Sequence, residues 1–463
     1  MTRDPASADR QGARASRAAT LLTASLAFAP IAIISLLGRH SALLLGSKLN
    51  MDLTNLAVMH RVLGSLGRPS LAADSWGPML KALGVLSGSD RNALYETLFF
   101  NAHVRFQYPP TSLLLIDLLA RFGLARVSVL NAINSGVLLL EALAVAVLAW
   151  SLFQPSADRP SASVRLQPAG MALVAGGAAF LFYPIIRAQA LGQIQLWLDL
   201  AFTLAVILWS QRRRLLPGVL VGLACAVKPQ FGLLLLWGLV SGERMFALGI
   251  VAGLAPLGLA SLALYGLHDN LAYLGVLSFL SRHGENFFAN NSVNGILNWY
   301  FTADNSLRWN EQGFAPYNPI VYAGTLAATL VFVGLLALSA MRTRRERRKA
   351  SLSDLGVATI CTIAGSPVAW EHHYGLLLPL FLVALCDSLA VADSGLRATL
   401  LTVTFVAWVL VADFIPFAAL LVGTPFVILQ AYCFFGAVIL LGVLIASREA
   451  ERAASATPVP ARS

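Results

Sequence analysis

Long apolar runs separated by short polar segments dominate this 463-residue chain from end to end. Runs of about 20 apolar residues are long enough to cross a bilayer as α-helices. The sequence therefore predicts an all-α polytopic membrane protein. The predicted spans lie near residues 17–38, 127–153, 168–188, 191–210, 215–228, 231–241, 245–266, 317–341, 352–370, 374–392, 396–414 and 424–446.

Composition and charge agree with this pattern, since 57% of the residues are hydrophobic and only 12% are charged. Soluble domains carry roughly twice that charge. The net charge of +10 comes from basic residues in the tails and in short segments between apolar runs, notably Arg212–Arg214 and Arg342–Lys349. Cytoplasmic loops of membrane proteins show this bias, whereas a nucleic-acid-binding surface would need a continuous basic patch. We therefore expect no nucleic-acid partner and a bacterial-type plasma (inner) membrane location with both termini cytoplasmic.

The predicted organisation is a basic tail over residues 1–16, a transmembrane domain over 17–446 and a second tail over 447–463. The first apolar run has no small-residue cleavage site after it, so we expect a retained helix. Two long loops, 40–126 and 267–316, fall on the outer face. Within the first, the apolar segment Thr111–Phe122 is too short to span and is expected to be a surface or re-entrant helix.

A polar cluster, Trp370-Glu371-His372-His373, stands between two apolar runs on the same outer face. Polar side chains at the mouth of a membrane bundle are costly and usually functional. Neighbouring side chains on a helix diverge by about 100°, so the two histidines do not suit one metal ion. The i, i+4 zinc spacing is absent, so no metal is expected. One histidine could instead donate a hydrogen bond to a phosphate, or simply bond backbone or water at a helix start.

Asp52 follows the first predicted helix and its short exit segment. An exposed carboxylate there could act as a general base that takes a proton from an attacking hydroxyl. The alternative is a helix cap, because aspartate is a favoured N-cap residue.

Three further segments stand out, and the first two have two interpretations each. Lys228, before Pro229 in a helix break, could neutralise an anionic lipid head or extend to the interface. The amide-rich run Asn290–Gly295 could bind sugar or phosphate, or form an ordinary turn. Tyr108-Pro109-Pro110 restricts the backbone before a short helix.

Taken together, these motifs resemble the GT-C polyprenol-phosphate-mannose-dependent mannosyltransferases of glycosyltransferase family 87. The resemblance runs from Asp52 to about Leu385. Two departures are the missing aromatic residue shortly after Asp52 and Glu371 in place of an aspartate before the histidine pair. The matching segments are Asp52, Phe106–Pro110, Gly192-Gln193, Pro217–Pro229, Asn291–Gly295 and Ser366–His373.

This resemblance implies a GT-C fold and an inverting, metal-independent transfer on the outer (periplasmic) face. The donor would be a polyprenyl-phosphate sugar, with mannose expected, and the acceptor a hydroxyl of a glycolipid or glycan among the membrane lipids. Asp52 would be the catalytic base and His372 would lie against the donor phosphate. The remaining expected binding residues are Lys228 and Arg187 for the phosphate, Gln193, Asn291 and Asn294 for donor or acceptor, and Tyr108, Trp370, Glu371 and His373 in the pocket wall.

Two other functions remain open from the sequence. A flippase for lipid-linked sugars would place polar residues near the membrane midplane in paired inverted halves, and neither pattern is visible. An outer-face ligase that moves a preassembled glycan would share the lipid-phosphate leaving group and differ in donor size.

Overall fold

The computed structural model describes residue 25 and residues 28–38, 52–65, 71–88, 93–154, 167–302, 305–310 and 313–456. Within these ranges every regular element is helical, apart from one isolated bridge between Asn290 and Trp370. The predicted tail 1–16 lies outside the described residues. Helix α17 (Tyr432–Ala456) carries the last predicted span on into the predicted tail 447–463.

Six helical stretches are long and apolar enough to cross a membrane, or seven if one bent pair counts as a span. The chain is therefore a multi-pass membrane protein, as predicted, but a count of twelve spans is not confirmed. The six are Val127–Phe153 (α5), Arg244–His283 (α11), Pro319–Arg345 (α13), Glu371–Ala390 (η4, Glu371–Leu376, with α15, Leu377–Ala390), Ser394–Ala412 (α16) and Pro425–Ala453 (η6, Pro425–Ala431, with most of α17).

Breaks in the backbone divide several of the predicted spans. Helices α6 (Pro168–Ala179) and α7 (Tyr183–Leu191) form the bent pair, at 43°. Gly192 then ends α7 with φ of 68°, a left-handed conformation that favours glycine. The shorter apolar helices are Phe28–Gly38, Gln195–Ser210 (α8), Leu215–Cys225 (α9), Pro229–Ser241 (η3, Pro229–Gly232, with α10, Leu233–Ser241) and Leu352–Ala364 (α14).

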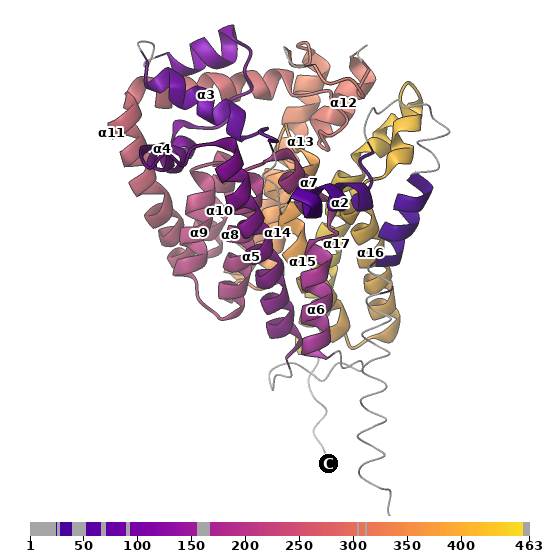
Figure 1. The fold of residues 1–463 in the computed structure, drawn as a ribbon. Coiled ribbons are helices and arrows are strands. Elements are labelled where there is room, and N and C mark those ends of the chain that lie inside the picture. Colours follow the sequence, from indigo (N-terminus) through magenta and orange to yellow (C-terminus); the bar gives the residue numbers. More distant parts are fainter. Residues whose placement is uncertain are drawn as a thin grey trace, which may run out of the picture.

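The first part of the second predicted outer loop is helical. Helix α11 continues past residue 266 to His283 and changes direction at Gly266, where φ is 77°. Glycine tolerates this value at no steric cost, so an apolar helix bends there instead of ending. The second half of α11 runs across the top of the bundle toward α12 (Val293–Phe301) in Figure 1.

Short helices cover the same end of the bundle, called here the loop end. The segment Thr111–Phe122 is helical and short, as predicted, and exposes Leu115, Leu118 and Phe122. This segment consists of η2 (Pro110–Leu113) and α4 (Leu114–Arg121). The other short helices are α2 (Asn55–Ser65), α3 (Trp76–Leu86), η1 (Glu96–Asn101) and η5 (Pro416–Leu421).

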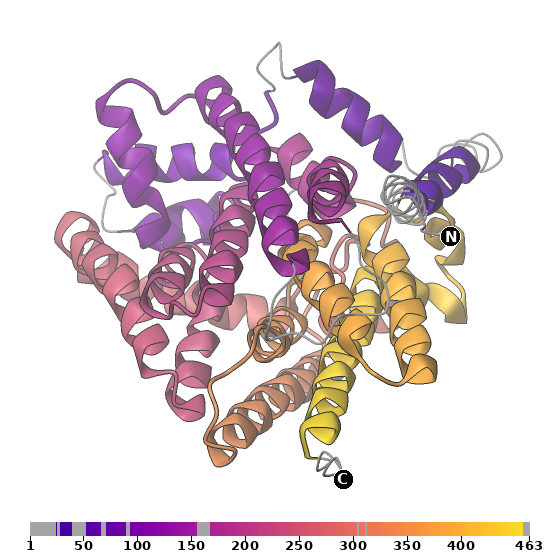
Figure 2. The ribbon, with the colours of Figure 1, turned by 90° about the horizontal axis from the view of Figure 1, so that it is seen from below.

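The basic segments meet at the opposite end. Asp354, fully buried at the start of α14, pairs with Arg348 at 2.6 Å and also with Arg448 of α17. Arg214 bonds Glu243 at 3.1 Å and the Ala350 carbonyl at 3.2 Å. These contacts join α13, α14 and α17 where the chain leaves the bundle, near the C-terminus in the view from below (Figure 2). The prediction that the basic loops share one side of the bundle agrees with this packing.

Helices α9 and α11 approach each other through glycines. Gly218 and Gly222 of α9 face Gly249 and Gly253 of α11, and a Cβ on any of the four would collide with backbone atoms of the opposite helix. Small residues spaced four apart allow helices in membranes to pack this closely. The packing matters for the site because α9 ends just before Lys228.

We expect Gly249→Val to destabilise the protein, because the added side chain must push α9 and α11 apart. Overpacking of this kind costs about 1–3 kcal/mol. Thermal unfolding in detergent would show this as a lower midpoint. Gly258→Val is the matched control, since no atom lies within 4 Å of a Cβ built at Gly258 of the same helix. Equal midpoints for the two variants would contradict the close packing.

Candidate active site

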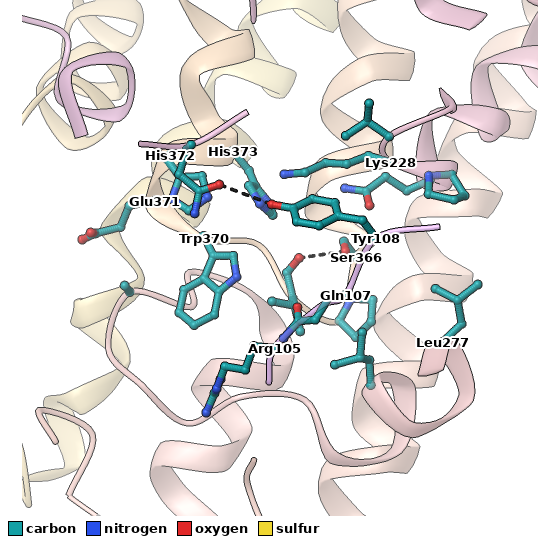
Figure 3. A pocket seen from close by; sticks show the side chains of 18 of the residues that line it. Arg105, Gln107, Tyr108, Lys228, Leu277, Ser366, Trp370, Glu371, His372 and His373 are labelled. Carbon is teal, nitrogen blue, oxygen red and sulfur yellow. Dashed lines mark hydrogen bonds between the residues drawn. The ribbon is translucent and has the colours of Figure 1, made fainter. Parts of the chain in front are cut away.

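A cavity of about 780 Å³ opens near the loop end and draws its walls from segments far apart in the sequence. One part of its lining is apolar, with Val227, Leu233, Leu277 and Leu280. The rest is polar and aromatic (Figure 3). The polar and aromatic lining includes Asp74, Arg105, Gln107, Tyr108, Arg187, Gln193, Lys228, Trp309, Trp370, Glu371, His372 and His373.

The loop before α3 is fastened to the junction between α7 and α8. The amides of Asp74 and Ser75 donate to the carbonyls of Leu191 and Gly192 at 3.0 and 3.3 Å. A Cβ on Gly192 would collide with the Ala72 carbonyl, so glycine is required both for its φ and for this close approach. The Gly192-Gln193 pair therefore attaches the first loop to the membrane bundle.

This attachment presents the Asp74 carboxylate to the cavity. The Gln193 amide donates to it, while the Gln193 carbonyl accepts from the Ser75 hydroxyl at 2.6 Å. The Asp74 side chain is exposed to the cavity. The surrounding protein raises the pKa of Asp74 by desolvation, while the Gln193 hydrogen bond and the charges of Arg187 and Arg105 act in the opposite direction. The sequence has no motif around Asp74. This residue is recognised as part of the site only through its long-range contact with Gln193.

Lys228 reaches the cavity from the break between α9 and η3. Pro229 disfavours a helical conformation for the preceding residue, and Lys228 has φ −129° and ψ 95°. Its ammonium group donates to Gln195 at 2.6 Å, and Gln195 donates in turn to Asp199 at 2.7 Å. The lysine is only 7% exposed, so its charge is held at a fixed point inside the bundle.

The two histidines lie in the same wall. The rings of His372 and His373 are 4.8 Å apart and nearly perpendicular, so one ion is not shared between them in this arrangement. His373 Nδ1 is buried and has no hydrogen-bond partner within the described residues. No group of three or more His, Cys, Asp or Glu side chains in those residues is arranged to hold a metal ion.

Arg187, from α7, also faces the cavity. It lies close enough to Asp74 and Glu371 to interact electrostatically with both carboxyl groups. Within the part of the chain that the structure describes, its guanidinium makes no hydrogen bond or ion pair. A guanidinium without a partner inside a cavity is a suitable ligand for an anionic group.

Glu371 has a different environment from Asp74. It is 1% exposed and accepts hydrogen bonds from Tyr432 at 2.8 Å and from Tyr183 at 3.3 Å. Both carboxylate oxygens are therefore occupied by protein donors. This arrangement suits a wall residue better than a proton acceptor.

The amide-rich run supports the site from behind. Asn290 accepts from the Ala369 amide at 2.9 Å, and the Glu371 amide donates to Ala289 at 3.0 Å. Asn291 accepts from the Cys433 amide at 3.1 Å, and its own carbonyl accepts from the Tyr374 hydroxyl. These contacts fix the Trp370–Tyr374 segment against α12 and α17.

Asn291 and Asn294, which the sequence predicts as binding residues, are fully buried and do not line the cavity. Asn294 accepts from the Glu285 amide at 3.1 Å and donates to Thr325 at 3.1 Å. Their amides are used inside the protein. Tyr108, Arg187, Gln193, Lys228, Trp370, Glu371, His372 and His373 all line the cavity as a group.

Asp52 also lies outside the cavity lining. Its exposed carboxylate accepts from the amide and hydroxyl of Thr54 at 3.0 and 2.8 Å, just before α2. This is a local Asx-type turn before the helix, and neither bond comes from an amide of α2. Its role as a base is untested and remains a prediction from the resemblance.

Comparison with known protein families gives one match. The profile of glycosyltransferase family 87 matches residues 106–367, which is more than half of the chain. The chain belongs to this family and is a membrane glycosyltransferase. A search of curated proteins gave no match, and no solved structure matches the chain. The matched region contains Tyr108, Arg187, Gln193 and Lys228, and it excludes Asp52, Asp74 and Trp370–His373.

We expect Asn291→Ala to lower thermal stability and to leave the KM for the sugar donor unchanged in the folded fraction. The substitution leaves the buried Cys433 amide without its acceptor, and an unmade buried hydrogen bond costs about 1–3 kcal/mol. Thermal unfolding in detergent measures the effect, with the exposed Asn101→Ala as control. An unchanged midpoint together with a raised KM would instead support direct binding by Asn291.

Proposed function

We propose that this glycosyltransferase moves a sugar, expected to be mannose, from a polyprenyl phosphate to a hydroxyl of a glycolipid or glycan. The observation that carries the proposal is one cavity that combines cationic groups, an accessible carboxylate and an apolar wall, inside a membrane bundle. A lipid phosphate needs the cationic groups and the apolar wall. A hydroxyl nucleophile needs the carboxylate.

The cationic wall suits the leaving group. Lys228 and Arg187, with a hydrogen bond from His372, would bind the phosphate and stabilise the charge that it gains as the sugar departs. The polyprenyl phosphate is a good leaving group, so no acid catalyst is needed. The pair of carboxylic acids found in glycoside hydrolases is therefore unnecessary here.

The transfer is a single displacement. The acceptor oxygen bonds to the anomeric carbon while the bond from that carbon to the phosphate oxygen breaks, and its electron pair leaves with the polyprenyl phosphate. The hydroxyl proton passes to a carboxylate and then to water. Attack from the face opposite the leaving group inverts the anomeric centre.

Two aspartates of the first loop are candidates for the base. The geometry favours Asp74, because its carboxylate faces the same cavity as Lys228 and Arg187. The family resemblance implies Asp52 as the base, but the Asp52 carboxylate accepts a hydrogen bond from Thr54. Gln193 would orient Asp74, which gives the Gly192-Gln193 motif a positioning role.

The remaining details of the proposal rest on the resemblance and on the charge pattern. They are the polyprenyl chain, mannose as the sugar, independence from metal ions, and an active site on the outer face of the cell membrane with both termini inside. The apolar lining at Leu233, Leu277 and Leu280 is consistent with a lipid chain entering the cavity.

Lys228→Met should lower kcat/KM for the donor by about 10²-fold, since it removes one fixed charge from the phosphate site. The assay is transfer of radiolabel from polyprenyl-phosphate mannose to a glycolipid extract by purified protein. Lys81→Met, at an exposed position outside the cavity, is the control. Full activity of Lys228→Met would contradict the phosphate site. Movement of the donor across liposome membranes without transfer would support a flippase, and use of oligosaccharide donors alone would support a ligase.

Asp74→Asn should lower kcat by about 10²-fold or more, because an amide does not accept the proton. In the wild type, kcat/KM should rise with pH through a pKa above the ordinary aspartate value of 3.8, since only the ionised carboxylate is active. Asp52→Asn should keep most of the activity. A full loss in Asp52→Asn with normal activity in Asp74→Asn would transfer the base role to Asp52.

A further inference from the structure

Three aromatic side chains form a continuous surface in the wall of the cavity. The Trp309 ring lies 5.1 Å from Phe287 and 5.8 Å from Trp370, measured between ring centroids. All three residues line the cavity. Trp309 keeps 41% of its surface exposed, so part of its ring is open to a ligand.

Arg105 holds this aromatic surface in place. Its guanidinium lies 4.0 Å above the Trp309 ring, pairs with Glu285 and donates to the Asn310 carbonyl at 2.7 Å. A cation over the face of a tryptophan is favourable. The ring is therefore fixed before any ligand binds, which lowers the entropy cost of binding.

The indole N–H groups are the second observation. Trp76, Trp197 and Trp299 donate to protein oxygens at 3.0, 2.6 and 2.7 Å. Within the described ranges, the N–H groups of Trp309 and Trp370 make no hydrogen bond to protein. Two donors are thus available beside an exposed aromatic face.

We propose that Trp309 and Trp370, with Phe287, bind a sugar ring of the acceptor. A pyranose has an apolar C–H face, which packs on an aromatic ring, and a rim of hydroxyls, which accept from indole N–H groups. An isoprenoid chain would use the aromatic face and leave both donors without partners. The apolar wall at Leu233, Leu277 and Leu280 already suits the lipid.

The position of this surface relative to the charged groups favours the acceptor. Trp370 is separated from the histidine pair by Glu371 alone. Trp309, by contrast, lies against the Arg105 guanidinium at 4.0 Å. The charge of Arg105 acts on Asp74, so Trp309 is near the carboxylate side of the site. The inference rests on the proposed function and adds which residues would hold the sugar ring of the glycolipid or glycan acceptor.

The test is binding of methyl α-mannopyranoside and methyl α-glucopyranoside to the full chain in nanodiscs, measured by saturation-transfer NMR. Nanodiscs avoid detergents with sugar head groups. Because no turnover occurs, binding is scored whether or not the transfer proposal holds. We expect at least one glycoside to bind, and Trp309→Ala to weaken its Kd about fivefold or more. Trp309→Phe should restore most of the affinity.

Trp150→Ala is the control, since Trp150 is 46% exposed on α5 and outside the cavity. Unchanged thermal midpoints would confirm that each variant is folded. Binding that persists when a polyprenyl-phosphonate mannose donor analogue, which resists transfer, is added supports the acceptor site. Displacement by that donor, equal binding to wild type and Trp309→Ala, or no binding of either glycoside would each overturn the proposal.

Discussion

The cavity depends on the junction that joins the first loop to the start of α8. Backbone hydrogen bonds from Asp74 and Ser75 to Leu191 and Gly192 fix the loop, and the left-handed Gly192 leaves room for it. The loop would otherwise be a surface connection, whose geometry is easily changed. Because it is fixed, the Asp74 carboxylate lines the same cavity as Lys228.

Most of the polar groups near this junction form hydrogen bonds within the protein, so few remain to bind a ligand. Glu371 is occupied by two tyrosines, and Asn290 and Asn291 are occupied by backbone groups. In a membrane bundle this satisfaction is required, since unpaired polar groups cost several kcal/mol in hydrocarbon. Asp74 and Arg187 stay available, so they are the stronger candidates for contact with substrate.

The sequence predicted the helical class, α5 to the residue and the order of the polar motifs, because apolar run length and local motifs are encoded locally. It did not predict that α11 continues as a helix beyond its bend at Gly266, since a glycine in an apolar run can bend a helix instead of ending it. It did predict the short pair of helices broken at Lys228-Pro229, which the structure has as α9 and as η3 with α10. In the site, the environments of Asn291 and Asp74 likewise depend on contacts with residues far away in the sequence. An amide-rich run has the composition of a ligand loop even when its amides are buried. Asp74 has no motif around it in the sequence, so it is recognised as a candidate only when the fold brings Gln193 beside it.

The central claim is that this cavity holds a lipid-phosphate sugar with its phosphate at the cationic wall. A structure of the full chain with a polyprenyl-phosphonate mannose analogue, which resists transfer, tests it most directly. The account predicts the phosphonate within hydrogen-bond distance of Lys228 or Arg187 and the anomeric carbon open toward Asp74. A phosphonate bound elsewhere, or a head group outside the cavity with only the lipid chain inside, would contradict it.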